Sequence, residues 1–363
     1  MKLHDLLDKD LLGTMMELGY VDFQVHPTEN LGILNYSKKA AWDGEWNDVT
    51  TACRGLIYDH QTYEVIARPF PKFFNYEQLG PEWEIPDGPV VATDKQDGSL
   101  GILYPLRDGG HAVATRGSFM SDQAKHATQI WNEKYEGKVL LEPGITYLFE
   151  IIYPENRIVL NYGSMDDLVL LGGVIIDSGS SLTAVEAKFV MDWPGPVTKT
   201  FPGYTFEEVL RMPPRENAEG IVVHFLATGE RVKLKQEDYV ALHRVITGMT
   251  DRSVWEALGQ GKTVEEIQEP LPEEFWPWVE QVAEDLFVKC ERSLLSAWDA
   301  YLNVTAALGP DFTRKDFAEY IKDYESPLKG YLFKYLDGES IRPLVWKTLK
   351  PAAVRSLVED VED

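Results

Sequence analysis

Residues 90–106 read VVATDKQDGSLGILYPL and contain the clearest structural signal of the chain. Apolar residues fill both ends of this stretch, and Asp97-Gly98 separates them with a turn signal, so each end is predicted to be a short strand. Short apolar runs bounded by Gly, Pro, Asn and Asp recur as far as residue 245. This texture favours antiparallel sheets over a doubly wound parallel fold.

The other predicted strands of this part share the same texture. They are LGILNY at 31–36, RGLIYD at 54–59, EVIARPF at 64–70, HAVATRG at 111–117, TYLFEIIY at 146–153, LVLLGGVIID at 168–177, GIVVHF at 220–225 and RVKLK at 231–235. Two helices are predicted between them, one over 121–135 and one after the capping box of Thr205 and Glu208.

The spacing of apolar residues changes after Asp238. From there to the end of the chain, apolar residues recur every three or four positions, as in DYVALHRVI, SVWEAL, RKDFAEYIKDY and VWKTLKPAAVRSLVED. We therefore expect an α+β protein with two domains. Residues 1–245 would form a domain built on antiparallel sheets, and residues 246–363 an all-α domain.

Composition and charge limit the class of protein. The chain has 363 residues, of which 44% are hydrophobic and 26% are charged, as in folded proteins long enough for two domains. The formal net charge of -24 argues against a broad basic surface that coats nucleic acid, but it is compatible with a local basic cleft. Two cysteines are too few for a disulfide framework, and no apolar run is long enough to span a membrane. We expect a cytoplasmic protein without a membrane partner.

Lys95 is the first candidate for chemistry. It stands at the end of a predicted strand, with Asp97 and Gly98 directly after it. A lysine followed by an acid and a glycine suits a nucleophilic amine beside a phosphate-bearing ligand, because glycine lets the ligand approach the backbone. The pattern K-x-D-G alone arises by chance in roughly one chain in ten of this length, and a hairpin turn with a solvated lysine would explain it equally well.

Further charged residues strengthen the chemical interpretation. Glu150 interrupts an apolar strand, Glu219-Gly220 opens another, and Lys233 and Lys235 lie two residues apart, so that both point to one face of a strand. Two ammonium groups held together are unfavourable unless an anion such as a triphosphate lies between them. More cations stand beside glycines or aromatic residues, namely Arg54, Lys72 and Arg116. Each of them also suits a strand edge or a simple ion pair.

The order of these motifs resembles that of covalent nucleotidyltransferases. KQDG at 95–98, the acid of FEIIYPENRIV, EGIVV at 219–223 and KLK at 233–235 follow one another as in polynucleotide ligases and capping enzymes. RGLIYD, FPKFFNYEQ and ATRGSFMSDQA make the resemblance more specific, because they are similar to the bacteriophage RNA ligase 1 family. The resemblance covers residues 50–240, whereas the helical part matches only in position, length and helical character.

The resemblance implies an ATP-dependent RNA ligase with a defined set of site residues. Lys95 would attack the α-phosphate of ATP and become lysyl-AMP, with Lys233, Lys235 and Arg116 favouring its neutral form and neutralising charge on the phosphates. Mg²⁺ or Mn²⁺ would be held by Glu150 and Glu219, and Asp97 would hold metal or the network around the ribose. The remaining nucleotide contacts would come from Arg54, Lys72, Phe74, Gly98, Gly220 and Tyr239.

The same resemblance implies the partners. AMP would pass to the 5′-phosphate of an RNA end, and a 3′-hydroxyl would then displace it. The helical domain of the family is associated with cleaved tRNA, which would make the protein an RNA repair enzyme that acts with an end-healing kinase and phosphatase. The residues themselves leave this substrate open, since other single-stranded RNA ends fit equally well.

Three other functions compete with this interpretation. A DNA ligase or a capping guanylyltransferase shares the motifs, but the usual appended domain of both is an OB-fold barrel rather than helices. A relative that binds RNA ends and has lost sealing is the second alternative, and the presence of all the expected charged residues argues against it. A structural adaptor would leave the arrangement around Lys95 unexplained. We assign no ligand role to His111, His126, His224 or His243, and Cys53 is expected to be a small buried residue although Arg54 beside it could favour a thiolate.

Overall fold

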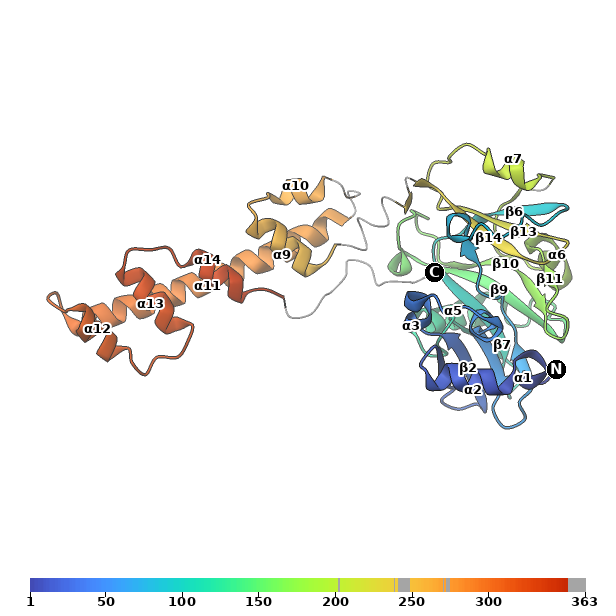
Figure 1. Cartoon of the computed structure of the whole chain (residues 1–363), viewed down its shortest axis with the longest axis horizontal. Helices are drawn as coiled ribbons and strands as arrows, with labels where there is room; N and C mark the ends of the chain where they lie inside the picture. The colour runs from blue at the N-terminus through green and yellow to red at the C-terminus, as the bar shows by residue number, and fades with distance from the viewer. Residues whose placement is uncertain (202, 238, 241–248, 270, 272–274, 352–363) are drawn as a thin grey trace. The chain divides into compact units, whose positions relative to one another are not determined.

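The computed structural model describes residues 1–201, 203–237, 239–240, 249–269, 271 and 275–351. The chain divides into two compact units, built mainly on Met1–Ala241 and on Leu242–Asp360. The described part of the first unit is mixed α/β with antiparallel sheets, and that of the second is helical (Figure 1). The domain boundary that we predict at residue 245 falls within 241–248, outside the described residues.

Three sheets form the framework of the first unit. Their strands pair antiparallel, except that β5 joins β14 in parallel. The first sheet contains, in spatial order, β1 (Val21–Val25), β2 (Leu31–Tyr36), β3 (Arg54–Asp59) and β4 (Val65–Ala67). The second contains β11 (Ser181–Leu182), β10 (Asp167–Ile175), β9 (Ile145–Ile152), β7 (Ser99–Pro105) and β8 (His111–Ala114). The third contains β12 (Thr200–Phe201), β6 (Val90–Lys95), β13 (Gly220–Phe225), β14 (Arg231–Lys235) and β5 (Phe74–Asn75).

The turn after Lys95 connects two different sheets. β6 belongs to the third sheet, whereas β7, which begins at Ser99, belongs to the second. Residues 96–98 therefore carry the chain from one sheet to the next, and the simple hairpin that the local sequence also allows is wrong. Lys95 consequently lies where two sheets meet.

Helices cover the outer faces of these sheets. α5 (Asp122–Ile130) continues into a π-helix (Trp131–Tyr135), as the spacing over 121–135 predicts, and α7 (Phe206–Leu210) begins at the predicted capping box. The expectation of only two helices in this part is wrong, because short helices with few apolar positions leave little periodic signal. The additional α-helices are α1 (Leu3–Leu6), α2 (Lys9–Glu17), α3 (Lys38–Asp43), α4 (Asp48–Ala52) and α6 (Ala184–Met191).

The third sheet has one apolar and one polar face. Ile221 and Val223 of β13 pack with Phe206 and Val209 of α7, which lies along this sheet in Figure 1. Successive side chains of a strand point to opposite faces, so the residues between these belong to the other side. That polar face carries the charged residues of the site.

The second unit is organised along one long helix. α11 (Trp276–Leu308) packs through buried residues such as Cys290 and Ala297 against the helices around it. These helices are α9 (Asp251–Gly259), α10 (Val264–Gln268), α12 (Arg314–Tyr320), α13 (Leu328–Leu336) and α14 (Arg342–Thr348). Phe317 and Tyr331 are buried in this unit, as predicted for core aromatic residues, whereas Trp298 stays partly exposed although its ring contacts Tyr301 and Tyr335. The helical pattern expected for DYVALHRVI falls largely outside the described residues.

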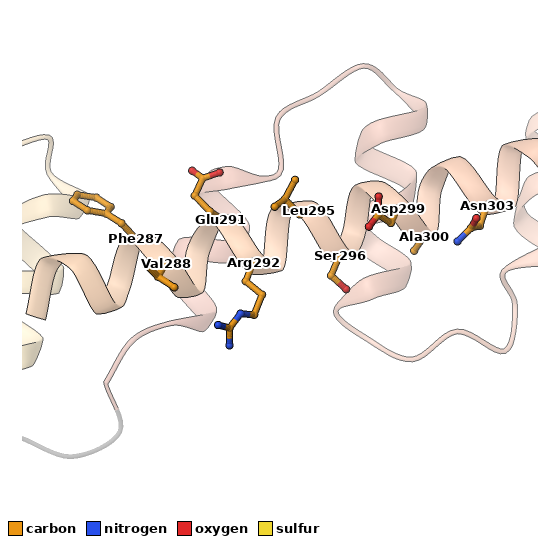
Figure 2. A pocket seen from close by; sticks show the side chains of 9 residues that line it. All are labelled: Phe287, Val288, Glu291, Arg292, Leu295, Ser296, Asp299, Ala300 and Asn303. Carbon is orange, nitrogen blue, oxygen red and sulfur yellow. The ribbon is translucent and has the colours of Figure 1, made fainter.

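A groove runs along the exposed side of α11. Its lining residues are Phe287, Val288, Glu291, Arg292, Leu295, Ser296, Asp299, Ala300 and Asn303 (Figure 2). The groove is partly apolar, since Val288 and Leu295 are both exposed. Among the described helices, α11 included, none combines the length and the apolar character that crossing a membrane requires.

Gly220 is required by the close approach of β13 and β14. A Cβ atom at this position would lie 2.1 Å from the carbonyl oxygen of Leu234 and 2.9 Å from the Cα atom of Lys235. Backbone atoms of a central strand cannot move aside without breaking the sheet. We expect Gly220→Ala to lower the free energy of unfolding of the first unit by about 1–3 kcal/mol, as measured by urea denaturation.

Gly13 provides the matched control. It lies inside α2, where a Cβ atom would meet no heavy atom within 4 Å. Because Ala favours a helix over Gly by about 1 kcal/mol, Gly13→Ala is expected to keep or raise the stability. A Gly220→Ala protein as stable as the wild type would show that the two strands are not this tightly paired.

Candidate active site

Lys95 and Lys235 lie on the same face of the third sheet. The register of β13 places Gly220 opposite Lys95 on one side and opposite Lys235 on the other. Directly paired residues of neighbouring strands point to the same face of a sheet. Lys95 and Lys235 therefore flank Gly220 on the same face.

Glu219 joins the two lysines through a single carboxylate. Its side chain is 0% exposed, and its Oε1 atom lies 2.7 Å from Nζ of Lys95 and 3.1 Å from Nζ of Lys235. A buried carboxylate is very unfavourable unless cations compensate it, so this pairing holds both ammonium groups in place. The structure thus brings together three of the residues predicted from the motifs.

Asp97 fixes the turn that follows Lys95. One carboxylate oxygen accepts the backbone N–H groups of Val159 and Leu160, each at 2.8 Å, and the other accepts the hydroxyl of Tyr239 at 2.7 Å. Asp97 is 4% exposed, so these hydrogen bonds form in a dry environment. These hydrogen bonds anchor the turn, and the metal or ribose-side role that the resemblance implies for Asp97 stays a prediction.

Glu150 lies on the opposite side of the turn. Its Oε1 atom accepts the backbone N–H of Gly98 at 3.0 Å, and a Cβ atom at Gly98 would lie 2.6 Å from the carbonyl oxygen of Ile151. Glycine is therefore needed here because the backbone of β9 approaches the turn, a more specific reason than room for a ligand.

Tyr162 marks the place where the acids converge. Burial is the main cause that raises the pKa of its hydroxyl, and the negative charges of Asp97, Glu150 and Glu219 raise it further. The hydroxyl accepts the backbone N–H of Asp97 at 2.8 Å. Tyr162 therefore stays neutral and supports the turn. Sequence analysis missed it because a tyrosine in a loop carries no motif signal.

A second group of predicted residues surrounds Tyr36. The Tyr36 hydroxyl accepts a hydrogen bond from Nζ of Lys72 at 3.4 Å and another from the guanidinium of Arg116. Nζ of Lys72 also lies 5.6 Å from the ring of Phe74 and 5.3 Å from that of Trp46. The sequence alone assigns no role to Tyr36 or Trp46. The two aromatic residues stand on either side of a short polar segment, and this position is the signal that could have identified them.

Positive charges gather around Lys72 in this second group. Burial lowers the pKa of Lys72, and the positive charges of Arg54 and Arg116 lower it further against the opposing effect of Tyr36. The structure places Arg116 here, beside Tyr36 and Lys72.

The cations of β14 continue in a row toward Arg54. Nζ of Lys233 lies 5.2 Å from the ring of Phe73, and the guanidinium of Arg54 lies 5.4 Å from the same ring. Arg231 precedes Lys233 by two positions and stacks on Phe70 at 3.8 Å. Arg231 was missed, yet the alternation in RVKLK assigns it to the same face as both lysines.

The surroundings of the described histidines and of Cys53 indicate structural roles for these residues. Burial lowers the pKa of His224 to about 3 and raises that of the Cys53 thiol to about 12, so His224 is neutral and Cys53 is a protonated thiol. The thiolate considered for Cys53 is therefore wrong, and the buried residue is confirmed. His111 contacts Glu136, and His126 contacts Asp166. His243 lies outside the described residues.

The described residues of the site offer carboxylates to a metal ion but do not form a complete set of protein ligands around it. Among the described residues, no group of three or more His, Cys, Asp or Glu side chains could hold a metal ion. Mg²⁺ commonly keeps several waters and binds one or two carboxylates together with substrate phosphates. Glu150 accepts the N–H of Gly98, and Glu219 lies beside the ammonium groups of Lys95 and Lys235, so either carboxylate would bind a metal next to groups that it already contacts.

The arrangement as a whole suits transfer of a phosphoryl group to an amine. It combines a buried amine at a sheet junction, a carboxylate shared with a second amine, and a row of cations ending in an aromatic cluster. Transition states of phosphoryl transfer are stabilised mainly by positioning and by positive charge.

Comparisons with known proteins agree with this chemistry. The family described as RNA ligase, of the T4 RNA ligase 1 type, matches residues 52–239, just over half of the chain. The RNA ligase of Rhodothermus phage RM378 is 25% identical over an alignment that covers 79% of this chain and 81% of the phage protein. A protein of Autographa californica nuclear polyhedrosis virus, named as a bifunctional polynucleotide kinase/RNA ligase, is 25% identical over 54% of this chain and 31% of its own length.

Solved structures show weaker similarity. An archaeal ATP-dependent RNA ligase aligns with 91% of this chain and 96% of its own at 15% identity, with a TM-score of 0.43. The assignment therefore rests on the family match and on the phage relative. The order of motifs from Arg54 to Lys235 predicts the same result, and this chain belongs to the RNA ligase family of the T4 RNA ligase 1 type.

Proposed function

We propose that this RNA ligase uses ATP to join a 5′-phosphate to a 3′-hydroxyl through lysyl-AMP at Lys95 and an RNA-adenylate. The observation that supports this most strongly is the buried carboxylate of Glu219, which lies 2.7 Å from the Lys95 amine and 3.1 Å from that of Lys235. An isolated surface lysine would need no such support.

The first step forms a P–N bond. Nζ of Lys95 attacks the α-phosphorus of ATP, the bond to the bridging oxygen breaks, and pyrophosphate leaves with that electron pair. The amine must lose its proton first. Lys235 also pairs with the carboxylate of Glu219. Glu219 therefore stabilises the protonated form of Lys95 less than it would if Lys235 were absent. Lys233 and Lys235 neutralise the charge that develops on the phosphates.

The charge balance around Glu219 changes during this step. Lys95 loses its positive charge when it becomes a phosphoramidate, and Glu219 then retains Lys235 as its cationic partner. The buried carboxylate therefore keeps a cation beside it after adenylylation.

Two clusters would hold the nucleotide. Arg54 and Lys233 face the triphosphate, and Lys72 and Arg116 complete the positive surroundings near Tyr36. Phe74 provides an aromatic surface for the adenine ring. Gly98 and Gly220 lie beside Lys95, and Tyr239 would line the pocket next to Asp97, to which its hydroxyl donates a hydrogen bond.

Mg²⁺, or Mn²⁺ in its place, would be held by Glu150 and, directly or through water, by Glu219. When bound, such an ion neutralises charge on the phosphates and helps pyrophosphate to leave. The ATP- and Mn-containing ligase structures of Naegleria gruberi are named for the same pair of ligands, but their TM-scores of 0.33 and 0.35 support no detail of geometry here.

The later steps use RNA ends. A 5′-phosphate oxygen attacks the phosphorus of lysyl-AMP, which restores Lys95 and forms a 5′-to-5′ pyrophosphate. A 3′-hydroxyl then attacks the 5′-phosphorus of the RNA, and AMP leaves. The net charge of -24 means that RNA is held by few cations, so binding should weaken steeply with salt.

We further propose that residues 1–245 carry adenylylation and that the helical residues 246–363 recognise RNA, with cleaved tRNA as one candidate. Repair of cut RNA needs a 5′-phosphate and a 3′-hydroxyl, which a kinase and a phosphatase supply. The name of the baculovirus relative, which includes a polynucleotide kinase, supports such a partner for this chain.

Other members of the nucleotidyltransferase class are less well supported. A capping enzyme would use GTP, and both capping enzymes and DNA ligases usually carry an OB-fold barrel, whereas the described residues after Asp251 form helices. A relative that binds RNA ends without sealing them would not need the shared carboxylate between Lys95 and Lys235.

Lys95→Ala is expected to abolish covalent labelling of the protein. Wild-type protein incubated with α-labelled ATP and Mg²⁺ should carry label through a denaturing gel, because the P–N bond survives unfolding. The same label should not form from GTP at comparable efficiency. A wild-type protein without label favours the RNA-end binding relative, and stronger labelling by GTP favours a capping enzyme.

Two further variants control for folding. Lys95→Ala removes an ammonium group that lies 2.7 Å from the buried carboxylate of Glu219, which can cost about 3–5 kcal/mol. Lys95→Arg keeps the positive charge beside Glu219 but supplies no amine nucleophile, so it should also stay unlabelled while retaining more stability. Lys188→Ala, at an exposed position of α6, should be labelled like the wild type.

Glu150→Gln tests the metal role of this acid. Gln keeps an oxygen that accepts the N–H of Gly98 but removes the negative charge. We expect the Mg²⁺ concentration for half-maximal lysyl-AMP formation to rise by about tenfold or more, and EDTA to abolish the reaction in the wild type. An unchanged Mg²⁺ requirement in Glu150→Gln, at unchanged stability, would exclude Glu150 as a metal ligand.

A further inference from the structure

α3 presents an unusually exposed tryptophan. The Trp42 side chain is 90% exposed, the highest value among the large hydrophobic residues described as exposed. The only described buried residue of this helix is Ala40. Lys38, one turn before Trp42, is also exposed. The outer side of α3 therefore carries an aromatic ring that the described residues of the first unit leave uncovered.

Several contacts hold this helix in place despite its shortness. The side chain of Ser37 accepts the N–H of Ala40, and Gly44 ends the helix with a left-handed φ of 69°. Lys39 donates to the carbonyl oxygen of Leu18 at 2.8 Å, and Tyr20 donates to Asp43 at 3.2 Å. Trp42 therefore lies on a helix whose backbone is held by hydrogen bonds to the rest of the first unit.

Both ends of α3 lead to the group of residues around Tyr36 that we propose to contact the nucleotide. Tyr36 precedes the helix by two residues and Trp46 follows Trp42 by four, and their rings lie 5.1 Å apart. Four residues span at most roughly 14 Å even when fully extended. The turn at Gly44 shortens this path, since the N–H of Trp46 bonds to the carbonyl oxygen of Gly44 at 3.0 Å. Trp42 therefore lies within this distance of Trp46, on the helix that connects the two aromatic residues of this group.

The surroundings favour stacking over charge as the mode of binding. Asp43 and Glu45 follow Trp42 directly, so the two lysines of α3 do not create a strongly positive surface. An exposed indole can still stack on any unpaired base, whatever the local charge. A single-stranded RNA end offers such bases, whereas duplex RNA keeps its bases stacked on one another.

We infer that Trp42 is a stacking platform for a base of the single-stranded RNA near the 5′-phosphate end. This inference rests on the proposed function in one respect, namely that RNA ends reach the Lys95 site. Trp42 would hold the substrate of the second step and would take no part in the reaction with ATP.

The test separates RNA binding from the chemistry of ATP. Wild-type protein and Trp42→Ala are first converted to lysyl-AMP, and AMP transfer to a 5′-phosphorylated single-stranded RNA of about 12 nucleotides is then measured against RNA concentration. We expect the apparent Kd for RNA to rise by about 5- to 100-fold in Trp42→Ala. The rate of lysyl-AMP formation should not change.

Two variants make the result specific. Trp42→Phe keeps an aromatic surface and should retain most of the affinity. Phe189→Ala removes a ring that is 88% exposed on α6 and should leave the affinity unchanged. The inference is overturned if Trp42→Ala binds RNA like the wild type, if Trp42→Phe is as weak as Trp42→Ala, or if lysyl-AMP formation falls together with RNA binding.

A binding experiment without ATP distinguishes this inference from the proposed function. Fluorescence anisotropy of the same RNA, labelled at its 3′ end, reports affinity even if no lysyl-AMP forms. A loss of affinity in Trp42→Ala would support the platform in a protein that failed the labelling test. Equal anisotropy curves for the two proteins would overturn the platform whether or not the protein seals RNA.

Discussion

The buried carboxylate of Glu219 is the constraint on which the rest of the site depends. It has no exposed surface, and its Oε1 atom lies within 3.1 Å of two lysine nitrogens. A charge in such a place is tolerated only with close cations, so Lys95 and Lys235 cannot move away without a large loss of free energy. The requirement extends to the backbone, because Gly220 must remain a glycine for β6, β13 and β14 to approach as they do. Acid, glycine and paired lysines therefore form one unit.

The fold places this unit at a junction of two sheets. Lys95 ends a strand of one sheet, and the next strand begins in another only four residues later, at Ser99. The intervening turn is fixed from several sides, by the hydrogen bonds of Asp97 and by the contact of Gly98 with Glu150. A nucleophile held in this way loses little freedom when it reacts, which is a main source of rate in phosphoryl transfer.

Much of this could be predicted from the sequence, because the informative residues follow strand periodicity. The alternation in RVKLK assigns Lys233 and Lys235 to one face, and the turn signal at Asp97-Gly98 marks the end of β6. What could not be predicted depends on contacts between distant segments. Tyr36 lies 80 positions before Arg116, and only the fold brings them together. The turn at Asp97 reads like a hairpin because sheet membership is decided by pairing partners far along the chain.

The central claim is that the amine of Lys95, held beside Glu219 and Lys235, forms the covalent bond to AMP. The most direct test is tandem mass spectrometry of peptides from protein that has reacted with ATP and Mg²⁺ in the absence of RNA. The account predicts AMP on Lys95 and unmodified Lys233 and Lys235. AMP attached to another residue, or no covalent AMP in a folded and ATP-binding protein, would contradict it.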